Sequence, residues 1–366
     1  MKAAAQRPLG NSRGGVEGER GAAKGERGAA KGVRSGAKGV RITDVAAAAG
    51  VSAITVSRVF NQPETVAPDT LARVRGVVAQ LGYVPNRLAG GLSSSRSRLV
   101  AAIVPTIAHS LFSESIQAFS DAMARAGYEV MLGLSGYSDV NEDQLLDAML
   151  SRRPEGVLLT GVTHTSGLRA RLSNIGIPII ETWDLTADPI DMLVGFSHRK
   201  VGAAVADAFI RSGRRHPALI SANDTRAQAR SAGFVERLEQ HFGPGVSVPE
   251  ILGTPPSSVS SGKSALTRLL DMAPEVDAVF CGSDLLALGV ARQAPALGRT
   301  VPGELAVCGF GDLEFAAEME PALSTVRVDG KRIGESAARA LIARLAGEGS
   351  LPVLDVGFSL IERGTT

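Results

Sequence analysis

Short apolar runs alternate with amphipathic stretches of helical periodicity from residue 99 to the end of the chain. Alternating strands and helices build parallel sheets that helices cover on both faces. There are too many runs for one small sheet, so we expect two doubly wound α/β subdomains. A ligand cleft is expected between them, at the carboxyl ends of the strands. The strands are predicted near 99–105, 128–134, 156–160, 177–181, 217–221, 277–281 and 305–310, and the helices near 112–126, 140–152, 198–212, 226–241, 284–297 and 330–346.

A different pattern, at residues 42–60 (ITDVAAAAGVSAITVSRVF), predicts two short helices joined by a tight turn. Thr43 can cap the first helix, which would start at Asp44, and Gly50 can end it in the left-handed conformation. Ser52 can cap the second helix. Two short helices joined in this way form a helix-turn-helix. The pattern favours an all-α DNA-binding domain over a helical packing module, which is the alternative.

The charge is distributed unevenly along the chain. Its net charge is +2, yet the first 96 residues carry +9 and the remaining 270 carry −7. The basic charge of the first 96 residues indicates that this part of the chain binds a polyanion such as DNA, whereas the acidic remainder does not. Within the basic part, residues 1–40 repeat the motif ERGAAKG and contain almost nothing that can be buried, so we expect a disordered tail. The expected domains are a tail, a helix-turn-helix domain, a hinge helix with linker and an α/β core, at 1–40, 41–84, 85–98 and 99–366.

Composition excludes several other classes of protein. The two cysteines, Cys281 and Cys308, lie in apolar runs and are too few for a disulfide framework or a cysteine-based zinc site. No apolar run reaches the roughly 18–20 residues that span a bilayer, and the N-terminus has no secretion signal, so we expect a cytoplasmic protein with no membrane partner.

An enzyme is also disfavoured. The five histidines are scattered, no catalytic motif is present, and neither a cofactor nor a metal is expected. Residues 257–264 (SSVSSGKS) end like a phosphate-binding loop, but Ser257 stands where that motif requires glycine. We therefore exclude nucleotide binding there and expect Lys263 to be a solvated helix residue.

Residues 42–62 (ITDVAAAAGVSAITVSRVFNQ) and 81–92 (LGYVPNRLAGGL) closely resemble the lactose-repressor (LacI/GalR) family of bacterial transcription regulators. The resemblance continues through the α/β core and leaves only the first 40 residues uncovered. It implies a homodimeric repressor with a core like that of periplasmic binding proteins, which binds a palindromic double-stranded DNA operator and is released by a small effector. A cytoplasmic sugar sensor without DNA function, or a corepressor-dependent regulator that responds to another sugar or sugar phosphate, is the alternative.

The resemblance assigns DNA contacts to specific positions. Ala53 and Ile54 match the positions that choose bases; both are apolar and could touch thymine methyls only. Arg58 could pair with guanine. The hinge helix corresponds to residues 86–92, with Leu92 as the apolar wedge in the minor groove. The full set of expected DNA contacts is Thr43, Ser52, Ala53, Ile54, Thr55, Ser57, Arg58, Asn61, Asn86, Arg87, Ala89 and Leu92.

The core resembles the effector-binding half of the family. Arg230, in ARSAGF, matches an arginine that grips the ligand, and Asp284, in GSDLLALG, matches an acid that receives hydroxyls. The chain differs from many family members at Ser197-His198 and at GFGD (309–312). The resemblance therefore does not determine which arrangement of ligand hydroxyl groups the pocket recognises. The expected effector contacts are His109, Phe112, His198, Arg230, Asp284 and Asp312.

Several stretches look closest to the gluconate-repressor branch of the family, namely 112–138, 158–167, 194–196 and 354–366. This similarity implies a sugar acid such as gluconate, or a phosphorylated or keto relative of it. Arg230 and His198 could supply positive partners for its carboxylate.

Overall fold

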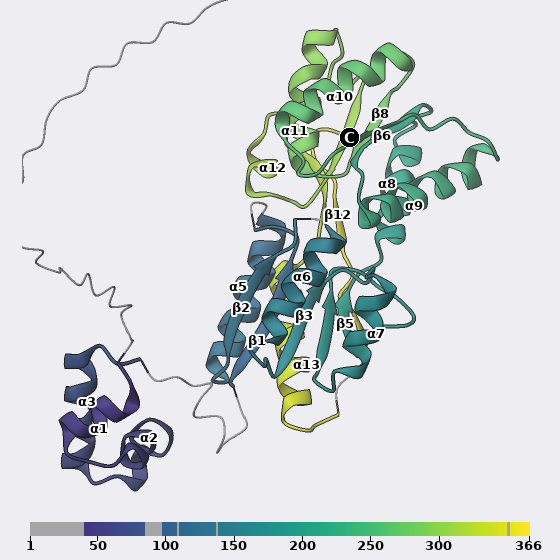
Figure 1. The fold of residues 1–366 in the computed structure, drawn as a ribbon. Helices are drawn as coiled ribbons and strands as arrows, with labels where there is room; N and C mark the ends of the chain where they lie inside the picture. Colours follow the sequence, from purple (N-terminus) through teal and green to yellow (C-terminus); the bar gives the residue numbers. More distant parts are fainter. Residues whose placement is uncertain (1–39, 85–96, 108–109, 137, 350–351) are drawn as a thin grey trace, which may run out of the picture. The chain divides into compact units, whose positions relative to one another are not determined.

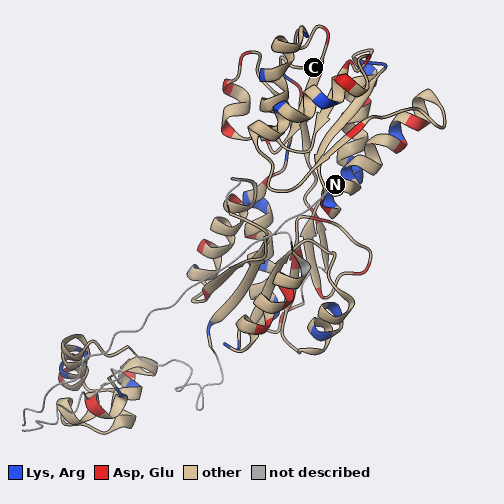
Figure 2. Ribbon diagram, turned by 45° about the horizontal axis from the view of Figure 1, so that its top comes forward, with Lys and Arg blue, Asp and Glu red and all other residues tan. Residues whose placement is uncertain are grey.

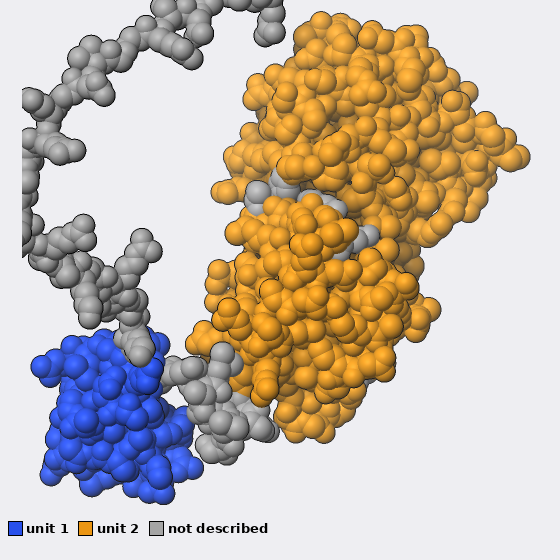
Figure 3. Space-filling model, viewed as in Figure 1, with its two compact units in different colours: residues 1–85 blue, residues 86–366 orange. Residues whose placement is uncertain are grey.

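The computed structural model describes residues 40–84, 97–107, 110–136, 138–349 and 352–366 (Figure 1). The chain divides into two compact units, residues 1–85 and 86–366, shown in blue and orange in Figure 3. The expected tail lies outside the described residues except for Val40, and so does the expected hinge and linker except for Ser97 and Arg98.

Unit 1 contains the predicted helix-turn-helix, followed by a third helix. Its described elements are α1 (Ile42–Ala49), α2 (Ala53–Asn61), the 3-10 turn η1 (Pro63–Thr65) and α3 (Pro68–Leu81). The helices enclose a small aliphatic core built from Val45, Ala46, Ala49, Val56, Val59 and Val74.

Local capping sets the ends of the first two helices. Gly50 ends α1 with φ 64°, and Ser52 Oγ caps α2 by accepting a hydrogen bond from the Thr55 amide at 3.1 Å. α1 begins two residues before the expected start. The carboxylate of Asp44 accepts a hydrogen bond from the Arg41 amide at 2.8 Å, so Arg41 takes the N-cap position that was predicted for Thr43.

Unit 2 contains the two expected α/β subdomains, each built on a six-stranded sheet. All strand pairs of the first sheet are parallel. Its order is β11 (Val353–Asp355), β5 (Met192–Gly195), β4 (Ile179–Thr182), β3 (Gly156–Thr160), β1 (Leu99–Val104), β2 (Glu129–Leu134). The central strands are buried on both faces, which explains why they read as continuous apolar runs.

The second sheet has the order β12 (Ser359–Ile361), β10 (Ser324–Arg327), β9 (Ala306–Phe310), β8 (Ala278–Cys281), β6 (Pro217–Ala222), β7 (Glu250–Gly253). Only the β10–β12 pair is antiparallel. Because each sheet takes strands from separated parts of the chain, the chain passes between the subdomains after β5, β10 and β11. Both cysteines are buried in this sheet.

Helices cover the two sheets. α13 packs on α5 and on strands β4 and β5, whereas α8, which follows β5, packs on α9 of the second subdomain (Figure 1). In Figure 2 most strands are free of charged residues, and basic and acidic residues are interspersed on the helices. The helices of unit 2 are α5 (Ser110–Arg125), α6 (Asp139–Leu150), α7 (Ser166–Asn174), α8 (His198–Arg211), α9 (Thr225–Phe242), α10 (Val259–Met272), α11 (Asp284–Gln293) with the 3-10 turn η2 (Ala294–Leu297), α12 (Glu314–Glu318) and α13 (Gly330–Leu345).

Lys263 lies exposed on α10, as expected. Within the described ranges no single helix is long and apolar enough to cross a membrane. The helices α1 and α2 meet those criteria only if they are counted together, and they are bent by 103° relative to each other.

Candidate functional site

The exposed side of α2 is the candidate DNA interface of unit 1. Ile54 is 67% exposed although its side chain is apolar, and Arg58 and Asn61 are exposed beside it. Asn61 donates a hydrogen bond from Nδ2 to Ser57 Oγ at 3.2 Å. The core of unit 1 uses none of these side chains, so α2 presents an apolar, a cationic and an amide group to a partner.

The other expected DNA contacts of unit 1 lie on α1, in the turn before α2 and on α2 itself. Thr43 and Ser52 are exposed, and Ala53, Thr55 and Ser57 are half-buried. The expected hinge contacts, and one expected effector contact, lie outside the described residues: Asn86, Arg87, Ala89, Leu92 and His109.

Unit 2 holds two adjoining cavities, of about 90 and about 520 Å³, between its two sheets. Both are lined by Asp224, Arg226 and Pro255. The cavities therefore occupy the position that the order of strands and helices predicted. Much of their lining comes from the carboxyl ends of strands in both sheets, among them Pro105, Thr160, Trp183, Ala222, Gly282 and Phe310.

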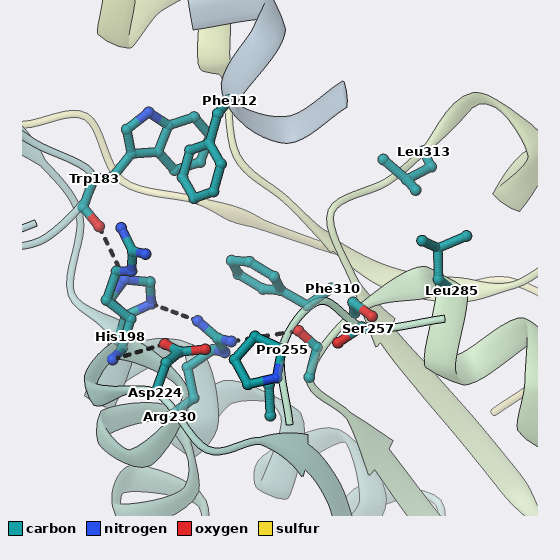
Figure 4. Close-up of a pocket in the computed structure, with 14 residues that line it drawn as sticks. Phe112, Trp183, His198, Asp224, Arg230, Pro255, Ser257, Leu285, Phe310 and Leu313 are labelled. Carbon is teal, nitrogen blue, oxygen red and sulfur yellow. Dashed lines mark hydrogen bonds between the residues drawn. The ribbon is translucent and has the colours of Figure 1, made fainter. Parts of the chain in front are cut away.

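Aromatic rings wall the smaller cavity, and two arginines lie against them (Figure 4). The rings of Phe112 and Trp183 meet edge to face, with centroids 5.1 Å apart. The guanidinium of Arg226 lies 5.2 Å from the Phe112 ring, and that of Arg230 lies 4.2 Å from the Phe310 ring. The ring faces stabilise these cations; Arg230 is buried and Arg226 is half-buried.

His198 lies in the wall of this cavity and is 3% exposed. Its Nε2 is 2.9 Å from the carbonyl oxygen of Trp183, and its Nδ1 is 3.1 Å from Nη1 of Arg230. Burial lowers the pKa of His198 well below its usual value, and the charges of Arg230 and Arg226 lower it further.

Three carboxylates line the larger, more polar cavity: those of Glu142, Asp184 and Asp224. Burial raises the pKa of Asp184, and this is partly offset by the Leu185 amide and by Arg226 and Arg230. Asp224 caps α9 by accepting hydrogen bonds from the backbone amides of Arg226 and Ala227 at 3.1 and 3.0 Å.

Asp284 and Asp312 do not line either cavity in the described part of the chain. Asp284 is fully buried and accepts hydrogen bonds from the Leu313 amide at 2.7 Å and from the Thr325 hydroxyl. Burial raises its pKa to about 6. Asp312 pairs with Arg363 and Arg327. Both carboxylates fix the loop after β9, and their contact with an effector stays a prediction.

The structure therefore brings together Phe112, His198 and Arg230 among the expected effector contacts. The cavity walls also contain residues that were not predicted from the sequence. For two of them the sequence pattern could have indicated the position. Arg226 precedes Arg230 by one helical turn in TRAQAR, and Asp184 follows a buried strand. Among the missed residues are Glu142, Trp183, Asp184, Asp224, Arg226 and Phe310.

Comparison with known proteins assigns both units. The pattern of bacterial regulatory proteins of the lacI family matches residues 41–86, and that of a periplasmic binding protein-like domain matches residues 206–366. The transcriptional regulator GntR of Pseudomonas aeruginosa is 38% identical over 329 residues, which are 89% of this chain and 95% of that protein. GntR of Escherichia coli K12 is 32% identical over 326 residues, which are 88% and 98% of the two chains.

Solved structures agree with this assignment. A LacI family transcriptional regulator from Silicibacter pomeroyi superposes with a TM-score of 0.83 at 30% identity and covers 89% of this chain and 99% of its own. A complex of the transcriptional regulator CelR with cellobiose has a TM-score of 0.65 at 28% identity and covers 89% and 100%. These relatives are transcriptional regulators and not enzymes. The chain therefore belongs to the LacI family of bacterial regulatory proteins and is a DNA-binding transcriptional repressor.

Proposed function

We propose that this repressor controls genes of sugar-acid breakdown and leaves a palindromic operator when a sugar acid such as gluconate binds between the two sheets of unit 2. The observation that carries the proposal is the pair of arginines, Arg226 and Arg230, in one cavity. Similarity to GntR proteins and to a regulator in complex with a sugar supports the same chemical class.

The two arginines favour an anionic ligand. They lie four residues apart near the start of α9, so their charges share one face of the helix. Like charges at this spacing destabilise a helix, whereas an anion between them relieves the repulsion and also meets the positive end of the helix dipole. A carboxylate can accept two parallel hydrogen bonds from a guanidinium, which fixes its orientation.

The larger cavity, which adjoins the one lined by both arginines, suits a chain of hydroxyl groups. Its wall combines three carboxylates, Glu142, Asp184 and Asp224, with hydroxyls and amides, among them Ser135, Ser138, Thr163, Thr225, Asn223 and Gln228. These side chains supply both hydrogen-bond donors and acceptors, as a polyhydroxylated ligand requires. A plain apolar ligand would leave most of them unpaired.

On the DNA side, we assign base contacts to Ala53, Ile54 and Arg58 and phosphate contacts to the polar residues around them. Two copies of unit 1 would read the two half-sites of a palindrome, and residues 85–98 would act as the hinge between each copy and its core at 99–366. Leu132 and Leu134, 40% and 48% exposed on edge strand β2, are apolar side chains that a second copy could cover.

The test is fluorescence anisotropy of labelled DNA from the region upstream of the gene, at fixed salt, with and without gluconate. We expect tight binding that gluconate weakens by roughly 5–150-fold, the usual range of such coupling. Tight binding that gluconate leaves unchanged would reject gluconate as the effector, and stronger binding would reverse the sign of regulation. A protein that binds no palindromic DNA in a salt-sensitive way would contradict the repressor function itself.

A matched pair of variants tests the carboxylate site. Arg230→Ala removes a buried charged donor, and we expect gluconate affinity to fall about 10–100-fold, which corresponds to about 1.5–3 kcal/mol. Lys263→Ala removes an exposed cation on α10 and should leave the affinity unchanged. Isothermal titration calorimetry measures both, and normal induction by gluconate in Arg230→Ala would show that the carboxylate binds elsewhere.

A further inference from the structure

A chain of hydrogen bonds links the two subdomains through His198 (Figure 4). Trp183, which follows β4 of the first sheet, presents its carbonyl oxygen to His198 Nε2 at 2.9 Å. On the other side of the ring, Nδ1 is 3.1 Å from Nη1 of Arg230 on α9. The imidazole therefore joins the ligand arginine of one subdomain to the loop after β4 of the other.

The chemistry of the two partners determines the protonation state of the ring. A carbonyl oxygen only accepts hydrogen bonds, so Nε2 must carry a proton and donate it to Trp183. A guanidinium only donates, so Nδ1 must be unprotonated and accept from Arg230. A second proton would place two donors face to face. The lowered pKa of His198 agrees with the neutral ring that these contacts require.

The rest of the network orients the guanidinium of Arg230. Its Nη2 donates to the carbonyl oxygen of Gly282 at 3.3 Å, and its plane lies against the Phe310 ring. The ring of His198 is itself held against Phe196, with centroids 4.6 Å apart. A side chain with several rotatable bonds is thus held in place before a ligand arrives, which lowers the entropy lost on binding.

Two glycines bring the helices close enough for this contact. A Cβ atom on Gly202 of α8 would lie 2.0 Å from the carbonyl oxygen of Arg230, and one on Gly233 of α9 would lie 2.1 Å from that of Arg199. The backbones of α8 and α9 therefore touch where His198 and Arg230 meet. The contact is built into the packing of the two helices.

We propose that His198 is a positioning residue for the effector site: as a neutral imidazole protonated on Nε2, it holds Arg230 toward the cavity and ties it to Trp183 of the other subdomain. The proposal rests on the function proposed above and replaces the expectation that His198 supplies a positive charge to the ligand. It assigns the recognition of the anion to Arg230 and the orientation of Arg230 to His198.

Two variants of His198 separate positioning from general packing. His198→Gln keeps one acceptor and one donor on a planar group, whereas His198→Leu removes both. We expect His198→Leu to bind gluconate at least 10-fold more weakly than the wild type and His198→Gln to stay within about 3-fold. Titration calorimetry measures the affinities, and circular dichroism verifies that both variants fold. His241→Leu, at the far end of α9, is the matched control and should bind like the wild type.

Equal loss of affinity in His198→Gln and His198→Leu, with both folded, would contradict the positioning role. So would an unchanged affinity in His198→Leu.

A second measurement needs no ligand and so distinguishes failure of this inference from failure of the proposed effector. In protein labelled with 15N-histidine, the signals of His198, assigned by their loss in His198→Gln, should show a protonated Nε2 and an unprotonated Nδ1 at pH 7. Arg230→Ala should raise the pKa of His198, because it removes both the donor and the nearest charge while Arg226 remains. An imidazolium or an Nδ1-protonated ring in the wild type would overturn the inference, whether or not gluconate binds.

Discussion

At the scale of the residue, α2 exposes one apolar and one cationic side chain on the same surface. Ile54 is 67% exposed, and Arg58 lies one helical turn further along. A single exposed apolar side chain is common on protein surfaces, so the indication of a partner comes from Ile54 and Arg58 together. The thymine methyl group and the acceptor pair of guanine are the groups of the major groove that such side chains match.

Arg58→Ala should therefore weaken binding to the operator by about 1–3 kcal/mol and change binding to unrelated DNA much less, if this arginine reads guanine. Anisotropy titrations of operator and scrambled DNA at one salt concentration measure the two affinities. An equal loss of affinity for both sequences would indicate that Arg58 contacts phosphate and not guanine.

A buried ion-pair cluster, also at the residue scale, makes stability depend on pH. His164 lies between Glu142 and Glu181, with each N···O distance 3.3 Å. Burial by itself lowers the pKa of His164, but the hydrogen bonds and charges of the two glutamates outweigh it and raise the pKa to about 9. The protonated ring thus stabilises the folded state.

Because the folded pKa is higher than the unfolded one, this stabilisation is complete below about pH 6.5 and is lost as the pH rises through about 9. We expect the free energy of unfolding to fall by up to about 3 kcal/mol over this range. Urea unfolding followed by the fluorescence of Trp183, the single tryptophan, measures it. In His164→Gln this pH dependence should be much smaller; a slope equal to that of the wild type would assign it to other groups.

At the scale of the element, the contact between α8 and α9 shapes the cavity proposed to bind the effector. Gly202→Ala would push a methyl group against the backbone of Arg230, so the two helices must move apart. We expect a loss of about 1–3 kcal/mol in stability and, in addition, weaker gluconate binding, because His198 and Arg230 would separate.

The matched control is Gly167→Ala on α7, where nothing lies within 4 Å of the added Cβ. Thermal unfolding and calorimetry of both variants test the prediction. If Gly202→Ala lost stability and kept full affinity for gluconate, the packing of α8 on α9 would not be what orients Arg230.

Helices and strands differ in how well the sequence predicts them. The long amphipathic helices were predicted to within a few residues, because their apolar periodicity extends over several turns. The short strands β5, β7, β10, β11 and β12 and the helices α7 and α12 were missed, and α10 was indicated only by the prediction that Lys263 lies on a helix. Three or four residues carry too little periodicity, and in α7 only Leu168 and Leu172 are buried.

At the scale of the whole molecule, the proposed dimer makes a measurable prediction. Leu134→Glu places a charge on edge strand β2, where a second copy would bury it at a high energetic cost. Sedimentation should therefore give twice the chain mass of 37.9 kDa for the wild type and the single mass for the variant.

Phe242→Glu, a change at a side chain that is 39% exposed at the end of α9, is the matched control and should remain dimeric. A wild type that sediments at the single mass would exclude the dimer. A dimeric Leu134→Glu would place the interface elsewhere.

The sequence by itself determined the two kinds of unit, the helix-turn-helix and the position of the cleft. These depend on patterns within short segments: caps, periodicity and the succession of strands and helices. It also marked Arg230, whose sequence context resembles that of the family.

Only the tertiary structure decided which groups share the cavity. Asp284 and Asp312 are directed to Thr325 and Arg363, whereas Trp183 and Asp184 line the walls together with Arg226, which is distant from them in sequence. The direction of a side chain depends on the partners that folding brings to it from other parts of the chain. The sequence could therefore name His198 as a pocket residue, but only the packing of α8 on α9 shows that its two ring nitrogens are already engaged, by Trp183 and Arg230.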